Sequence, residues 1–402
     1  MHLASVLLTL AAATTALAQF TVPVGRAIRN VNITAAERAL GDAAYSVNRV
    51  SSVVKLRGPR PPRPPKNSDA LENLGNEAYI VNVTLSDGNN YTIDLDTGSS
   101  DTWLIGLNTS SPGITSLDSE YLDFYGGGIA FGDVYKGTLS IGKASATIAL
   151  GNALIEDVLP LAADGLLGLA YSALSAISEE VNTTLPTNWF DASNIENKIF
   201  GFYLSNAANG DNGEVTFGGY DREKFYGPIK WLDVQAPTLI GDGNEFLWWA
   251  FSTNNITWSV RPHAAAGIPG GSGPINPGNA DPNGPTPYAI ADTGTTLSIL
   301  PNTTAYGIAE ALGLSFNDSI GWYTFEYSET ASLPPVNIHF NSTTFAIPSS
   351  VYAYDYGGFN LFGIVNGGDT LSIFGDIFSR VAYTIFDKVN NRVGYATAIH
   401  PW

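Results

Sequence analysis

The sequence contains no cysteine among its 402 residues. Thiol nucleophiles, cysteine-ligated zinc sites and disulfide bonds are therefore excluded, and stability must come from the size of the core. Histidine is also scarce, since the chain has only His2, His263, His339 and His400, which lie far apart without a His-Glu-X-X-His pattern. We therefore expect no metal site and no cofactor.

Long apolar runs are nearly absent. The apolar segment Met1 to Ala18 ends in Ala16-Leu17-Ala18, a small-residue pattern typical of signal-peptide cleavage before Gln19. No later segment reaches the roughly 18 uninterrupted apolar residues that a membrane-spanning helix needs. We expect residues 1–18 to be a signal peptide and the protein to be secreted without a membrane anchor, with the vacuole as the alternative location.

Basic residues are few and unevenly placed. The chain has 19 Lys and Arg against 37 Asp and Glu, and nine of the 19 fall within residues 19–66 beside only two acidic residues. That segment has a net charge of +7 and the rest of the chain −25. The contrast predicts a basic propeptide on an acidic mature chain. Its end from Arg57 to Lys66, with five prolines, predicts an extended linker, although a simple spacer fits equally well.

Other functional classes lack their motifs. The segment Arg57 to Lys66 has no aromatic residues and precedes a chain that would repel phosphate, so we expect no nucleic-acid partner. No Gly-X-Ser-X-Gly sequence is present, and Gly126-Gly127-Gly128 precedes no helical pattern, so neither a serine hydrolase nor a phosphate-binding loop is indicated.

From Ala78 onward the chain consists of short β-branched and aromatic runs separated by turn residues, with 42 Gly and 23 Pro in the whole sequence. This composition predicts an all-β fold. The best helix candidates are Ser172 to Val181 and Thr303 to Leu312. The Gly- and Pro-rich stretch from Pro262 to Pro287 predicts a long surface loop.

One short motif occurs twice, as Asp96-Thr97-Gly98-Ser99-Ser100 and as Asp292-Thr293-Gly294-Thr295-Thr296. Each copy follows an apolar run, so each Asp should lie where a buried strand turns sharply, at a turn that Gly98 or Gly294 permits. A single copy could be an ordinary turn, but a matched pair indicates shared chemistry.

Two carboxylates held close together in an apolar setting share one proton, which makes one of them an acid and the other a base. Such a pair can activate a water molecule and protonate a peptide carbonyl. The hydroxyls of Ser99 and Thr295 are suited to hold the outer carboxylate oxygens. A glycosidase also uses two carboxylates, but glycosidases lack paired Asp-Thr-Gly turns.

These motifs resemble the pepsin-like aspartic proteases, peptidase family A1, and most of all secreted fungal acid proteases. Asp96 and Asp292 match the two catalytic positions, and each is followed later by an apolar pair and Gly, in Leu166-Leu167-Gly168 and Ile373-Phe374-Gly375. Trp103, Tyr125 and Gly126 resemble the residues of the flap that closes over substrate. The resemblance covers about residues 79 to 398.

The resemblance implies an all-β, bilobal fold with the active-site cleft between the lobes. We place the N-terminal lobe at residues 79–205 and the C-terminal lobe at 206–398. It further implies a monomeric aspartic endopeptidase (EC 3.4.23) that hydrolyses proteins or peptides at acid pH and is inhibited by its own propeptide. The alternative is a catalytically weak peptide-binding protein on the same scaffold, because Gly127 replaces the polar residue usual in the flap.

Nine Asn-X-Ser/Thr sequons indicate a glycoprotein in which some of the sites are used. They are Asn32, Asn82, Asn90, Asn108, Asn182, Asn255, Asn302, Asn317 and Asn341.

Overall fold

A computed structural model describes residues 68–73, 78–156, 158, 163–180, 184–206, 213–236, 245–277, 287–356, 358–368 and 372–399. The predicted signal peptide and basic propeptide lie outside these residues, as do Asn32 and Asn182. No helix within them is long and apolar enough to cross a membrane.

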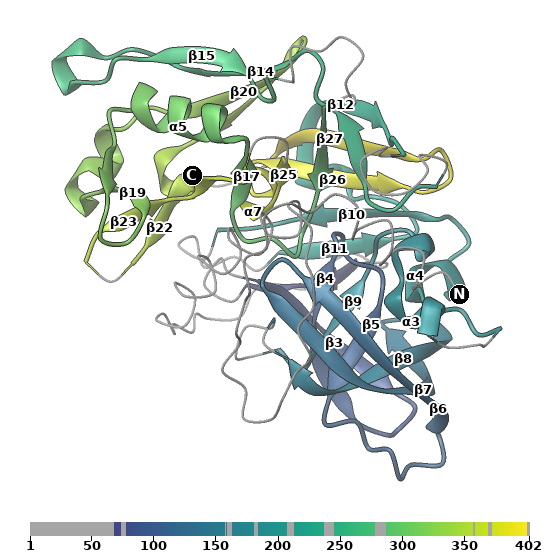
Figure 1. Ribbon diagram of the computed structural model, residues 1–402. Coiled ribbons are helices and arrows are strands. Elements are labelled where there is room, and N and C mark those ends of the chain that lie inside the picture. Colours follow the sequence, from purple (N-terminus) through teal and green to yellow (C-terminus); the bar gives the residue numbers. More distant parts are fainter. Residues whose placement is uncertain are drawn as a thin grey trace, which may run out of the picture.

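The described chain is built mainly from strands, which confirms the all-β prediction (Figure 1). Short strands form because apolar and polar residues alternate. In Val336–Phe340, for example, Val, Ile and Phe are buried while Asn and His between them are only partly so. The N-terminal half forms an eight-stranded sheet in the order β2-β3-β4-β9-β5-β8-β7-β6, closed by pairing of β3 with β7. Its strands are β2 Glu72–Asn73, β3 Tyr79–Leu85, β4 Asn90–Asp96, β5 Thr102–Ile105, β6 Thr115–Tyr125, β7 Gly128–Ile141, β8 Ala144–Glu156 and β9 Gly165–Gly168.

The C-terminal half contains a five-stranded sheet in the order β13-β16-β25-β17-β24 and two four-stranded sheets, β15-β14-β20-β21 and β18-β19-β23-β22. The strands of the first are β13 Ala250–Ser252, β16 Tyr288–Ala291, β17 Ser298–Leu300, β24 Ile364–Asn366 and β25 Ile373–Phe374. Those of the other two are β14 Ile256–Val260, β15 Gly271–Pro274, β18 Ser315–Asn317, β19 Trp322–Phe325, β20 Val336–Phe340, β21 Thr343–Ile347, β22 Ala353–Asp355 and β23 Asn360–Phe362.

The two halves repeat one pattern of strand pairing. In the first, β9 is parallel to β4 and antiparallel to β5, which is in turn parallel to β8. In the second, β25 is parallel to β16 and antiparallel to β17, which is parallel to β24. The same order of four strands therefore surrounds each copy of the Asp-Thr-Gly motif, as duplication of one ancestral half would produce.

A six-stranded sheet joins the halves, in the order β1-β11-β10-β26-β27-β12. It takes one strand from the predicted N-terminal lobe, β10 Ile199–Tyr203, and four from the predicted C-terminal lobe, namely β11 Glu214–Phe217, β12 Phe225–Asp233, β26 Ala382–Asp387 and β27 Arg392–Ala398. Its remaining strand, β1 Ser68–Ala70, precedes both predicted lobes. Phe200 of β10 stacks on Phe386 of β26 with ring centroids 4.8 Å apart, and Trp249 contacts both rings. The boundary between residues 205 and 206 stays a prediction.

Helices are short in the described chain. They are η2 Ser172–Leu174, α3 Ala176–Glu180, α4 Trp189–Ala192, η4 Arg222–Lys224, η5 Ala264–Ala266, α5 Asn302–Ala311, η6 Tyr327–Ser332, α6 Ser349–Tyr352 and α7 Asp376–Ser379. Helix α5 confirms the second predicted helix. The first predicted helix is divided into η2 and α3, and Val181 lies outside the described residues.

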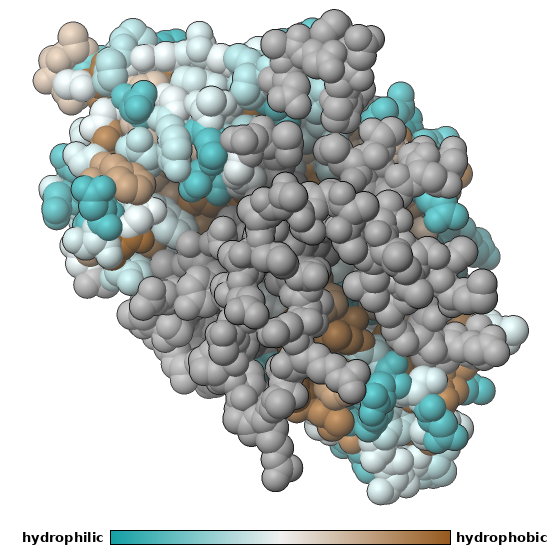
Figure 2. Space-filling view, in the orientation of Figure 1, coloured by the Kyte–Doolittle hydropathy of each residue, from teal (hydrophilic) through white to brown (hydrophobic). Residues whose placement is uncertain are grey.

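The stretch from Pro262 to Pro287 is not wholly a loop. Its Gly271–Pro274 portion is strand β15, which pairs with β14, and η5 precedes it. The prediction of a loop was wrong for these residues. On the face seen in Figure 2, most described atoms over α5 and β19 are hydrophilic or neutral, as expected when the apolar side chains of these elements face the core.

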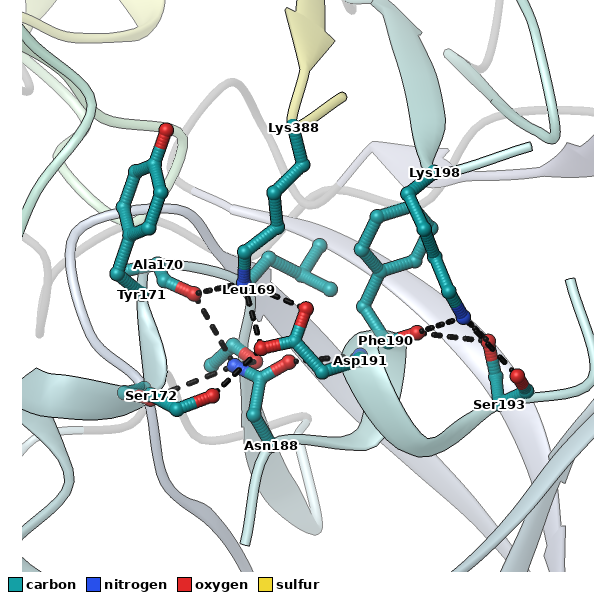
Figure 3. Close-up of polar contacts among 12 residues, drawn as sticks. Leu169, Ala170, Tyr171, Ser172, Asn188, Phe190, Asp191, Ser193, Lys198 and Lys388 are labelled. Carbon is teal, nitrogen blue, oxygen red and sulfur yellow. Dashed lines mark hydrogen bonds and ion pairs between the residues drawn. The ribbon is translucent and has the colours of Figure 1, made fainter. Parts of the chain in front are cut away.

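A partly buried lysine also links the halves (Figure 3). Lys388, in the turn between β26 and β27, lies 2.6 Å from one carboxylate oxygen of Asp191 on α4 and donates to the carbonyl of Ala170 at 3.4 Å. Its ammonium also lies 4.9 Å from the ring centroid of Tyr171. Because Ala170 follows β9, this contact connects the C-terminal strands to the backbone behind the first motif.

Candidate active site

Each motif aspartate lies where a strand ends and the chain turns. Asp96 is the last residue of β4 and Asp292 follows β16, and the two side chains are 5% and 9% exposed. In each turn the Gly backbone N–H donates to one carboxylate oxygen, at 2.7 Å from Gly98 and 2.9 Å from Gly294. Both inner oxygens therefore have a fixed partner.

The hydroxyl residues of the motif hold the other oxygens. Ser99 donates to Oδ2 of Asp96 at 2.5 Å, and Thr295 donates to Oδ2 of Asp292 at 2.7 Å. Short bonds of this kind to a carboxylate are strong and directional. Each carboxylate is therefore held by two donors from its own turn.

The two carboxylates face each other across the halves. A Cβ built on Gly98 would lie 2.5 Å from Cγ of Asp292, and one on Gly294 would lie 2.3 Å from Oδ1 of Asp96. Only glycine allows this approach. Burial, and then the charge of Asp292, raise the pKa of Asp96 well above its ordinary value, so the pair resists double ionisation.

Backbone hydrogen bonds brace both turns from behind. The N–H of Leu169, just after β9, donates to the carbonyl of Asp96 at 2.7 Å. In the second half the N–H of Asp292 donates to Phe374 of β25 at 3.2 Å, and the N–H of Asp376 donates to Thr295 at 2.9 Å. The apolar-pair-and-Gly segments thus lie directly behind the motifs that they were matched with in the sequence.

The central threonines of the motifs join the two turns. The N–H of Thr97 donates to the hydroxyl of Thr293 at 3.2 Å, and the N–H of Thr293 donates to the hydroxyl of Thr97 at 3.0 Å. Each hydroxyl then donates to a carbonyl of the opposite half, that of Ala291 at 3.0 Å and that of Leu95 at 2.6 Å. Four reciprocal bonds therefore set the distance between the carboxylates.

The three predicted flap residues also come together. Tyr125 ends β6 and Gly126 lies in the turn between β6 and β7. The indole Nε1 of Trp103, on β5, donates to the hydroxyl of Tyr125 at 2.7 Å, and the two rings meet edge to face with centroids 6.2 Å apart. A hairpin tip is thereby tied to a strand that begins six residues after Asp96.

A model of the eukaryotic aspartyl protease family matches residues 78–398. The chain belongs to this family. It is 30% identical over 340 residues to rhizopuspepsin of Rhizopus chinensis, covering 79% of this chain and 78% of that protein. It is also 30% identical over 347 residues to aspergillopepsin-1 of Aspergillus oryzae, covering 80% and 78%.

The fold agrees with this assignment. The structure of an aspartic proteinase from Irpex lacteus superposes with a TM-score of 0.66 at 22% identity, covering 82% of this chain and 97% of that one. The prediction of a bilobal pepsin-like fold is confirmed. This aspartyl protease is accordingly a hydrolase of the aspartic endopeptidase class, as predicted.

Two further carboxylates of the aspartyl protease surround the pair, and sequence reasoning gave them no role. Asp94, two residues before Asp96, is 6% exposed, and burial, followed by the charge of Asp292, raises its pKa to about 7. Asp376, after Gly375, is fully buried without a hydrogen bond to either carboxylate oxygen. Burial raises its pKa well above the ordinary value, although Arg380 opposes the shift. In the sequence, the only indication of a role for Asp94 and Asp376 was that each lies close to a motif residue.

Among the described residues, no group of three or more His, Cys, Asp or Glu side chains could hold a metal ion.

Proposed function

We propose that Asp96 and Asp292 are the catalytic pair of an acid-acting, secreted endopeptidase. The observation that supports this most strongly is the close approach of the two carboxylates across the halves, with each outer oxygen held by a hydroxyl. Such a pair carries a single proton in acid and can act as acid and base at once.

Hydrolysis then proceeds without a covalent intermediate. The ionised member of the pair takes a proton from water, whose oxygen attacks the peptide carbonyl carbon, while the protonated member gives its proton to the carbonyl oxygen. On collapse of the resulting diol, one diol hydroxyl gives its proton to the ionised member of the pair, while the protonated member gives its proton to the leaving nitrogen. The C–N bond breaks and the pair again carries one proton. Ser99 and Thr295 keep the two carboxylates oriented throughout.

In this proposal residues 19–66 act as an inhibitory propeptide. The mature enzyme is monomeric and glycosylated, and its substrates are proteins or peptides. The net charge of +7 on that segment opposes −25 on the remainder. As pH falls toward about 4, near the ordinary pKa of Asp and Glu, protonation of carboxylates weakens the attraction. Release of the propeptide and single protonation of the pair then occur in the same pH range.

One experiment tests catalysis and maturation together. The purified full-length chain, Asp96→Asn and Asp292→Asn are incubated at about pH 4 and about pH 7 and followed by mass spectrometry, with a protein substrate added in parallel. We expect the parent to lose its propeptide and cleave substrate only at pH 4, and a statine-type transition-state mimic to block both.

Each variant should stay full length and inactive while folding normally, because either change removes half of one proton-sharing unit. Losses in the double variant should not exceed those in the single ones. Substrate cleavage by either folded variant would sink the catalytic assignment. A parent that binds the mimic without cleaving any substrate would favour the peptide-binding alternative.

A further inference from the structure

The flap carries a carboxyl group that the catalytic scheme does not use. Asp123 lies on β6 two residues before Tyr125, so the alternation of a strand puts both side chains on the same face. Its Oδ2 accepts a hydrogen bond from the hydroxyl of Tyr125 at 2.8 Å. The acid therefore touches the flap tyrosine within a single hairpin.

This contact commits the only proton of the tyrosine hydroxyl. A phenol has one proton to donate and can also accept hydrogen bonds. Nε1–H of Trp103 donates to the Tyr125 oxygen at 2.7 Å, and the Tyr125 hydroxyl donates its hydrogen bond to Asp123. The Tyr125 ring is thus held by Trp103 on β5 and by Asp123 on its own strand. Its hydroxyl can accept a hydrogen bond from an incoming peptide but cannot donate one to it.

The negative charge of Asp101 acts on the carboxyl group of Asp123. The Asp101 carboxylate is buried and accepts from the Ser175 hydroxyl and from the backbone N–H groups of Ala176 and Ile177, the latter two at 2.6 and 3.2 Å. Burial, and then the charge of Asp101, raise the pKa of Asp123 to about 8. A neutral carboxylic acid keeps its carbonyl oxygen as an acceptor, so the bond from Tyr125 survives in acid.

The other titratable groups near this contact are Tyr121 on the same strand and Glu156 at the end of β8. The Asp123, Asp101 and Glu156 charges all add to burial in raising the pKa of Tyr121. Within the described part of the chain, no cation contributes to the pKa shifts of Asp123 and Tyr121. The hydrogen-bond donor that Asp123 has here is therefore the neutral hydroxyl of Tyr125.

We propose that Asp123 is a positioning residue of the flap: it accepts a hydrogen bond from the Tyr125 hydroxyl and, together with Trp103, fixes the orientation of that ring for substrate. The inference rests on the proposed function, because it assigns Asp123 a part in the same hydrolysis. Asp123 acts through Tyr125 and does not itself touch the reacting atoms.

A double-mutant cycle tests this assignment. Peptide hydrolysis at about pH 4 is measured for the matured parent, Asp123→Ala, Tyr125→Phe and the double variant. Each single change should lower kcat/KM by about twofold to tenfold, the range for loss of one ordinary hydrogen bond. The double variant should lose no more than Tyr125→Phe alone, since Asp123 then has no hydroxyl to position.

Two further variants separate positioning from packing and charge. Asp123→Asn keeps a carbonyl acceptor and should retain the parental kcat/KM at pH 4. Glu120→Ala removes a carboxyl group from an exposed position on the same strand and should leave kcat/KM unchanged. Midpoints of thermal unfolding confirm that each variant is folded.

The outcomes are distinct. Losses that multiply in the double variant, no loss in Asp123→Ala, or a loss in Asp123→Asn equal to that in Asp123→Ala would each overturn the positioning role. Should Asp123→Ala fail to fold, Asp123→Asn is measured in the parent and in the Tyr125→Phe variant, and a loss in either background overturns it. A parent that cleaves no peptide overturns the proposed function itself.

Discussion

At the scale of single residues, the structure depends on side chains whose partners lie in the other half of the molecule. Thr97 is fully buried, and its hydroxyl accepts from the N–H of Thr293 and donates to the carbonyl of Ala291. Without that hydroxyl, two buried backbone groups would lack a partner. Buried polar groups left in this state cost about 1–3 kcal/mol each.

Thr97→Val should therefore lower the free energy of unfolding by about 2–4 kcal/mol and lower kcat, because the distance between Asp96 and Asp292 is no longer set. Thr97→Ser keeps the hydroxyl and serves as the control, with less than about half of that destabilisation. Denaturant unfolding and peptide hydrolysis measure the two effects. Equal stability of the Val and Ser variants would contradict the role of the hydroxyl.

The contacts inside each motif could be predicted from local residues, and the pairing of Asp96 with Asp292 from the repeat of the motif, but the contact between the two central threonines was missed. Ser99 and Gly98 bond to an aspartate two or three residues away, so the five-residue motif already contains the geometry. The partners Thr97 and Thr293 lie 196 residues apart. Their contact exists only after two halves have folded and docked, and no local pattern encodes it.

At the scale of elements, two short strands behind the catalytic turns leave no room for a side chain. A Cβ on Gly375, which follows β25, would lie 2.0 Å from the carbonyl oxygen of Leu297 and 2.2 Å from that of Thr295. Both contacts are with backbone, which cannot rotate away as a side chain can.

Gly375→Ala should consequently destabilise the protein by at least about 2 kcal/mol and displace the turn that holds Asp292. Gly219→Ala is the matched control, because a Cβ there meets nothing within 4 Å. That variant should lie within about 0.5 kcal/mol of the parent. Thermal unfolding compares the two, and a Gly375→Ala protein as stable and active as the control would refute the packing argument.

A helix with regularly spaced apolar residues could be predicted from the sequence, whereas a glycine-rich strand that forms by pairing with another strand could not. Helix α5 follows Pro301 and buries Ala305, Ile308 and Ala309 on one face, a pattern visible in the sequence. Strand β15 contains Gly271 and Gly273, which resemble a loop. Cβ atoms on these glycines would lie 3.3 and 3.0 Å from the Trp258 indole, so the glycines let this strand pair with β14 beneath a large ring.

At the scale of the whole molecule, buried acids make stability depend on pH. The pKa values of Asp94, Asp96, Asp123 and Asp376 are all raised, to about 7 for Asp94 and about 8 for Asp123. In the unfolded chain these groups release their protons near pH 4. The folded protein keeps them to higher pH, so the stability these groups contribute is fully present below about pH 4 and is lost as pH rises through about 8.

We therefore expect the thermal midpoint to fall steadily between about pH 4 and pH 8. Over this range the free energy of unfolding should decrease by up to about 1.4 kcal/mol per pH unit for each group. Full-length Asp96→Asn suits the measurement because it should not digest itself. Adding Asp123→Asn should flatten the fall, most of all between about pH 5 and pH 8. A midpoint that is constant or rises over this interval would show that these acids do not govern stability.

The six-stranded sheet has one further consequence. Its edge strand β1 pairs antiparallel with β11, Ser68 opposite Thr216 and Ala70 opposite Glu214. This strand begins two residues after Lys66, the last basic residue of the predicted propeptide. Proteolysis just before Ser68 would leave β1 paired with β11. Removal of residues up to and beyond Ala70 would leave the backbone N–H and C=O groups of β11 exposed at the edge of the sheet. An open strand edge is a template for the strand of another chain, so over-trimmed protein should self-associate and precipitate while correctly cut protein stays dispersed.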